Sequence, residues 1–147
     1  MAGKALNVRI QIDGADQLLR AFRELPKDAT EELRVKSLEI SQWMAKQATS
    51  AGRAEGRQAA LVAGTVKARR DRVPVVIAGG AKRLGRNKAP AGKLLFGSEF
   101  GSNRLKQYKR HIGRGSYWFF KSVEDNQADI EKKWLEAAVE IIERFHS

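Results

Sequence analysis

The last part of the chain carries the pattern that most limits its fold, which is that of a long amphipathic helix. Between about Val123 and Phe145, apolar residues recur at intervals of three and four, the period of one face of an α-helix. Glu124, Asp125 and Asp129 would stand at its positive N-terminal end. A helix with one apolar face has to bury that face, so we expect it to pack against the rest of the domain. Its apolar residues are Ile130, Trp134, Leu135, Ala138, Ile141, Ile142 and Phe145.

A second long helix is predicted from about Asp28 to Ala51, with Pro26 near its start. A shorter helix is predicted at 15–25, and the alternation of apolar and polar residues at 6–12 indicates a half-buried strand before it. The stripe of the long helix is formed by Ala29, Leu33, Ile40, Met44 and Ala48, and is widened by Val35, Leu38 and Trp43.

The middle of the chain predicts a β-hairpin with basic residues along one face. Residues 65–69 alternate, 70–72 form a polar turn, and 73–78 form the second strand. Pro74 has no N–H for the ladder, so that strand should lie at an edge or begin there. After it we expect a loop at 79–92, a short helix or strand at 94–100 and a short strand at 116–120.

These elements predict an α+β fold. A small mixed or antiparallel sheet, including the basic hairpin, should pack against one long central helix and the C-terminal amphipathic helix. The 147 residues suit a single domain, 1–147, with a basic loop insertion at about 79–93. The chain has no cysteine, which excludes disulfides, thiolate catalysis and sulfur-ligated metals. It opens without the apolar core of a signal peptide, and no apolar run is long enough to span a bilayer, so we expect a soluble protein that is not secreted.

The positive charge is concentrated in the middle segment. From Arg53 to Arg114 there are 16 basic and three acidic residues, a net charge of +13, whereas the rest of the chain has 12 basic and 14 acidic residues, a net of −2. Such a block indicates an anionic partner or an anionic space. The candidate basic residues are Lys67, Arg69, Arg70 and Arg72 on the hairpin, and then Lys82, Arg83, Arg86, Lys88, Lys93, Arg104, Lys106, Lys109, Arg110 and Arg114.

Several catalytic patterns are weak here. The spacing of Gly80 and Gly85 resembles a phosphate-binding loop, but the Lys and Ser or Thr that should follow are missing, which favours a flexible basic loop. Ser98 lacks the context of a nucleophile elbow, and His111 is better explained as an exposed loop residue than as a ligand. Glu99 is an isolated acid in a basic segment, and we expect it to form a salt bridge to an arginine rather than to act as a general base. We therefore predict no enzyme activity, no cofactor and no metal site.

The aromatic run at 117–120 could stack bases, but core or sheet residues with one face at an interface explain it better. No helix-turn-helix, RNA-recognition or zinc-finger pattern accompanies it.

The order of these segments resembles the tail-completion, or head–tail joining (neck), proteins of long-tailed bacteriophages over nearly the whole chain. VRIQIDGADQLLRAFRELPKDATEELRVKSLEISQWMAKQA is similar to the opening of that family, and TVKARRDRVPVVIAGG to its central strand pair. LLFGSEFGS carries its Glu-Phe-Gly element at Glu99, Phe100 and Gly101. GSYWFFKSVEDN, with Tyr117 and Trp118, resembles its closing segment, although Lys121-Ser122 stands where many members have Pro-Ala.

The resemblance implies a structural virion protein at the head–tail junction, assembled in the host bacterial cytoplasm. Six or twelve copies would associate head-to-tail in a closed ring that joins the tail tube to the filled head and leaves a channel for DNA. Its partners would be itself and other neck and tail proteins, namely the connector or stopper and the tail terminator or tail tube. It would touch genomic DNA transiently and without sequence preference, and it would not contact a membrane.

The basic segment would then face either the DNA channel or acidic surfaces of neighbouring proteins. A different class of function is a stand-alone basic protein that binds nucleic acid without sequence preference. A small nuclease is a third alternative, for which the sequence offers no convincing catalytic set.

Overall fold

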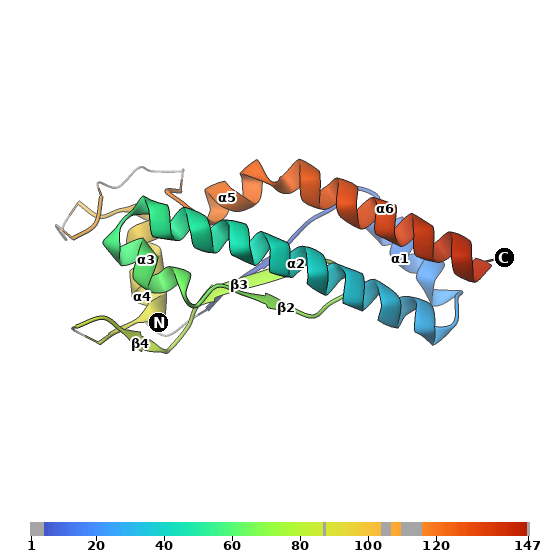
Figure 1. The fold of residues 1–147 in the computed structure, drawn as a ribbon, viewed down its shortest axis with the longest axis horizontal. Coiled ribbons are helices and arrows are strands. Elements are labelled where there is room, and N and C mark those ends of the chain that lie inside the picture. Colours follow the sequence, from blue (N-terminus) through green and yellow to red (C-terminus); the bar gives the residue numbers. More distant parts are fainter. Residues whose placement is uncertain (1–4, 87, 104–106, 110–115, 147) are drawn as a thin grey trace.

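The computed structural model describes residues 5–86, 88–103, 107–109 and 116–146 of the chain. Two helices run along its length: α2, Lys27–Glu55, and α6, Gln127–His146 (Figure 1). They pack against each other, with the short helix α1, Ala15–Arg23, at one end of the pair. Their apolar stripes explain this packing, because each stripe is buried where the two helices meet.

Three antiparallel strands form a small sheet in the order β1-β3-β2. They are β1, Ala5–Arg9, β2, Lys67–Arg69, and β3, Val75–Gly79, and β3 lies in the middle. α2 covers one face of this sheet and contacts both β2 and β3. The basic hairpin predicted from the sequence is confirmed as β2 and β3, and Pro74 precedes the first paired residue of β3.

The remaining elements gather at the end of α2 that lies away from α1 (Figure 1). Helix α3, Arg57–Ala63, follows α2, and helix α4, Ala91–Phe100, packs against α3 and β3. A two-stranded hairpin of β4, Arg83–Leu84, and β5, Ala89–Pro90, leads into α4. Helix α5, Phe119–Asp125, contacts α2 and precedes α6. The described residues therefore form the α+β fold that the sequence predicts, with a long central helix.

The core is continuous from the sheet to the C-terminal helix. Trp134, predicted to lie on the apolar face of α6, is fully buried. Leu33, predicted to lie on the apolar stripe of α2, is also fully buried. The other large buried side chains are Phe22, Met44, Leu95, Trp118, Phe119, Ile130 and Ile141. No helix among the described residues is both long and apolar enough to cross a membrane.

Four predictions about local structure were wrong. Residues 57–63 form α3, where the sequence analysis placed no helix. The expected loop at 79–92 contains the β4–β5 hairpin. The expected strand at 116–120 is irregular up to Trp118 and then becomes the first turn of α5. The C-terminal helix is interrupted at Asn126, so that α5 and α6 are separate helices.

Candidate assembly and nucleic-acid interface

Glu99, near the end of α4, is the first residue of the Glu-Phe-Gly element, and it is completely buried. Its Oε1 accepts hydrogen bonds from the backbone N–H groups of Trp118 and Phe119, each at 3.0 Å, and its Oε2 accepts one from that of Phe120 at 3.1 Å. These N–H groups belong to the start of α5, where a helix has donors without partners of its own. Glu99 therefore fixes the position of α5 relative to α4.

Burial raises the pKa of the Glu99 carboxyl above its ordinary value of 4.5, and the three backbone donors, together with Ser116, oppose that rise. Among the described residues the carboxylate is held by backbone N–H groups and forms no ion pair, so the salt bridge to an arginine expected from the sequence is not found there. A carboxylate enclosed in this way has a positioning role.

Two further bonds join the same segments. The N–H of Tyr117 donates to the main-chain oxygen of Glu99 at 2.7 Å, and the indole N–H of Trp118 donates to Ser98 Oγ at 3.0 Å. The Ser98 hydroxyl itself donates to the carbonyl of Leu95 at 3.1 Å. Since its proton and a lone pair are both in use, Ser98 is a structural link between α4 and α5.

The five predicted motif residues are thus brought together, but their exposures differ. Glu99 and Trp118 lie inside the domain, with Trp118 only 1% exposed. Phe100, Gly101 and Tyr117 are half-buried and reach the surface. If this motif contacts a partner, the contact is therefore made by Phe100, Gly101 and Tyr117.

An aromatic surface extends from this motif. Phe96, on α4, is 48% exposed, and its ring lies 5.8 Å from that of Phe100, measured between centroids. The ring of Phe100 lies 6.1 Å from that of Phe120. We call these three residues the aromatic ridge. Open hollows of about 750 Å³ and 540 Å³ flank it, the first along α4 and the second along α5.

The predicted basic residues that follow the β2–β3 hairpin, apart from Lys93 of α4, fall into three groups. Lys82, Arg83, Arg86 and Lys88 are exposed on the β4–β5 hairpin, where Arg83 Nη1 donates to the main-chain oxygen of Lys88 at 3.0 Å. The predicted residues Arg104, Lys106, Arg110 and Arg114, together with His111, lie outside the described residues.

Lys109 forms the third group by itself, because it is engaged within the domain. It makes an ion pair with Glu55 of α2, and its Nζ lies 5.3 Å from the centre of the Tyr117 ring. Next to it, the ring of Tyr108 lies directly over Gly97. This contact was not predicted from the sequence, in which a glycine inside the short helix or strand expected at 94–100 is the one signal for it.

The structure also bears on the Gly80 and Gly85 spacing that resembles a phosphate-binding loop. The segment between Gly80 and Gly85 runs into β4. The first N–H groups of α4, those of Ala91 and Gly92, donate to the main-chain oxygens of Lys82 and Gly80 at 2.7 Å and 2.9 Å, so they are used within the chain and are not left for a phosphate. No group of three or more His, Cys, Asp or Glu side chains suited to a metal ion occurs among the described residues.

Comparison of the chain with protein-family models, curated proteins and solved structures found no match.

Proposed function

We propose that this protein is a structural component of the neck of a long-tailed bacteriophage. In this role, copies of the chain form a closed ring, six or twelve in number, that joins the tail tube to the DNA-filled head and leaves a channel for DNA. The role requires association with identical subunits and with the neighbouring neck and tail proteins, and it has no catalytic step.

The observation that carries the proposal is the set of bonds around Glu99. Two of the segments that resemble the phage family, the Glu-Phe-Gly segment at 94–102 and the closing segment at 115–126, are separate in the sequence. In the structure the carboxylate of Glu99 binds the start of α5, so the two resembling segments form one physical unit. This supports the resemblance, because it gives the Glu-Phe-Gly element a physical role that depends on the closing aromatic segment.

The aromatic ridge supports the assembly part of the proposal. An exposed Phe at the edge of a stacked aromatic group is costly in water, and such patches commonly mark contact surfaces. The ridge lies beside the hollow along α4, which offers room for side chains of a neighbouring subunit. The exposed cations of the β4–β5 hairpin lie at the same end of the molecule.

Electron microscopy of a phage lysate in which only this gene is disrupted tests the proposal. We expect filled heads and separate finished tails, which join when the purified protein is added back. Normal intact virions from the disrupted phage would refute it. In that case the stand-alone nucleic-acid-binding alternative would remain.

Two variants make the add-back test specific. Phe96→Ser removes the most exposed ring of the ridge and should reduce joining, whereas Val35→Ser should join normally. Val35 is a suitable control because it is an apolar helix residue that is 49% exposed, compared with 48% for Phe96, and it lies on α2 outside the ridge. Equal joining by both variants would exclude the ridge as an assembly contact.

A further inference from the structure

The three-stranded sheet has a second face, which α2 does not cover. Successive side chains of a strand point to opposite faces. In β3, Val76 and Ala78 belong to the core cluster beside α2, whereas Val75 and Ile77 are outside that cluster. Val75 and Ile77 therefore mark the opposite face, which we call the outer sheet face.

The strand register places cations on both sides of these residues. Arg9 of β1 and Arg69 of β2 are the partners of Val75, and Lys67 of β2 is a partner of Ile77. Directly paired residues point to the same face, so all three cations belong to the outer sheet face. From strand geometry, Arg9 and Arg69 are about 10 Å apart across the sheet, and Lys67 and Arg69 are about 7 Å apart along β2.

All three cations are exposed, and no ion pair engages them among the described residues. Their neighbour Arg70 differs, because it pairs with Glu31 of α2. Val75 is only 3% exposed although it lies outside the core cluster, which fits cover by the aliphatic stems of the flanking arginines.

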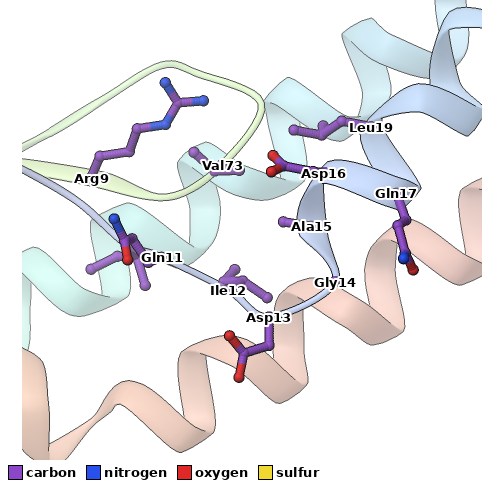
Figure 2. A pocket seen from close by; sticks show the side chains of 11 residues that line it. Arg9, Gln11, Ile12, Asp13, Gly14, Ala15, Asp16, Gln17, Leu19 and Val73 are labelled. Atoms are coloured by element: carbon purple, nitrogen blue, oxygen red, sulfur yellow. The ribbon is translucent and has the colours of Figure 1, made fainter.

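Figure 2 shows how Arg9 lies at the edge of this face. Its side chain extends over the turn between β2 and β3 and away from Asp13. Asp16 stands on the other side of the adjoining hollow, and no ion pair joins it to Arg9. The acids of this region therefore leave the charge of Arg9 available to a ligand.

The positive character continues beyond the sheet. β3 ends at Gly79 and leads directly into the β4–β5 hairpin, whose cations are exposed. The chain has no acidic residue between Asp71 and Glu99. In Figure 1 this hairpin extends away from α1, past the end of the sheet, so the two features follow one another along the molecule.

We propose that the outer sheet face binds the sugar–phosphate backbone of duplex DNA, with Arg9, Lys67 and Arg69 contacting phosphates. The paired strand residues of this face include cations and no acid, which suits a polyanion, and such contacts do not depend on base sequence. The face presents Asn7 and Ile77 between its cations and no aromatic ring, which disfavours single strands because these are held by stacking.

This inference rests on the proposed neck function in one respect only: in a neck ring the outer sheet face would line the DNA channel. Arg9 was not among the basic residues singled out from the sequence. The pairing of β1 with β3 places it on the outer sheet face. The exposed cations of β4 and β5 would extend the same contact.

Fluorescence anisotropy with a labelled DNA duplex, at salt concentrations between about 50 and 200 mM, tests the proposal. We expect salt-dependent binding by the wild-type chain. The triple variant Arg9→Gln, Lys67→Gln, Arg69→Gln should bind at least about tenfold more weakly at the lowest salt, and its slope of log K against log salt should be shallower by about 2.7, or about 0.9 per lost phosphate contact.

A triple variant on the helices, outside the outer sheet face, provides the matched control. Arg20→Gln, Arg23→Gln and Lys46→Gln change the net charge by the same amount at exposed positions on α1 and α2. This control should keep the wild-type slope. Circular dichroism should show that both triple variants are folded. An equal loss in the two triple variants, or none in the first, would overturn the proposal, because net charge or another surface would then explain the binding.

Polyglutamate distinguishes DNA from an acidic protein as the ligand. Duplex DNA carries one charge per about 1.7 Å, compared with about 3.3 Å in an extended polypeptide, so polyglutamate at equal charge concentration should compete poorly. Equal competition would overturn the assignment to DNA. A protein that joins heads to tails without binding duplex would refute this inference alone, and one that binds duplex through this face without joining them would refute the neck function alone.

Discussion

The indole N–H of Trp134 donates a hydrogen bond to the main-chain oxygen of Arg72, 2.9 Å away. The same nitrogen lies 3.1 Å from Ser37 Oγ, and the Ser37 hydroxyl donates to that same oxygen of Arg72 at 2.7 Å. Ser41 continues the link, because its Oγ accepts from the N–H of Val75 at 2.9 Å. The two long helices and the turn that leads into the central strand therefore meet at one carbonyl group.

Replacing Trp134 should separate the value of this hydrogen bond from that of the buried ring. Trp134→Phe keeps most of the apolar volume and loses the donor, so we expect the free energy of unfolding to fall by about 1–3 kcal/mol. Trp134→Ala also leaves a cavity and should cost roughly 3–5 kcal/mol. Urea denaturation measures both costs. If Trp134→Phe were neutral, the hydrogen bond would contribute no net stability.

Gly52 of α2 is required by the packing of Trp118. A Cβ at this position would lie 2.9 Å from Cε3 and Cζ3 of Trp118 and 2.9 Å from Cβ of Ala63. Alanine is favoured over glycine in a helix by about 1 kcal/mol, but overpacking costs typically about 1–3 kcal/mol, so we expect Gly52→Ala to lower the melting temperature.

Gly64 serves as the control for this prediction. It has φ −66°, and its nearest neighbour to an added Cβ would be the oxygen of Leu61 at 3.9 Å. Gly64→Ala should therefore be neutral or slightly stabilising. A melting temperature that is equally changed in both glycine variants would contradict the packing argument.

Gly97→Ala should displace the ring of Tyr108. The added Cβ would lie 2.3 Å from Cζ and 2.5 Å from Cε1 and Cε2 of that ring, so the ring has to move. Burial raises the pKa of the Tyr108 hydroxyl above its ordinary value of 10.0. A ring that moves into solvent should titrate closer to 10.0, which ultraviolet absorbance can follow. An unchanged titration in Gly97→Ala would show that the ring stays buried.

Glu99→Gln should weaken the joint between α4 and α5. One oxygen can still accept from Trp118 and Phe119, but the amide nitrogen that replaces Oε2 would face the N–H of Phe120, so that two donors oppose each other. We expect a loss of about 1–3 kcal/mol in the free energy of unfolding. Glu39→Gln, in an exposed ion pair with Lys36, should cost far less. Equal costs would contradict the capping role of Glu99.

The same carboxyl predicts how stability depends on pH. Its pKa is raised in the folded protein, so folding takes up a proton between the unfolded and folded values. Its contribution is therefore fully present below the unfolded value, near 4.5, and is lost as the pH rises through the folded value. The difference in unfolding free energy between the wild type and Glu99→Gln should thus be largest in acid and shrink toward neutral pH. A difference that grows with pH would mean that the three N–H donors outweigh burial.

Periodicity alone was enough to predict the two long helices and the β2–β3 hairpin. Trp134 falls on the apolar stripe of α6, and the alternation at Lys67 and Arg69 matches β2. These patterns are visible in the sequence because each element buries one side along its whole length. Helices α3 and α5 were not predicted as separate helices, because each has only seven residues, too few to display a period.

The role of Glu99 could not be predicted from local sequence. The residues that it binds begin 19 positions later along the chain, and a lone acid among cations suggests an ion pair before it suggests bonds to backbone N–H groups. The run at Trp118 and Phe119 has the composition of a strand. It starts a helix because the buried carboxylate satisfies three N–H groups that a strand would have paired elsewhere.

Glu99 also closes the chain on itself. Its main-chain oxygen holds Tyr117 and its side chain holds the three residues that follow, so the two ends of the segment between Glu99 and Tyr117 are fixed beside each other. Because its ends are held together, a change in the length of this segment that keeps the contacts of Tyr108 and Lys109 should put little strain on the helices that carry it. Related chains can therefore be expected to differ in the length of this segment while they keep the glutamate that closes it.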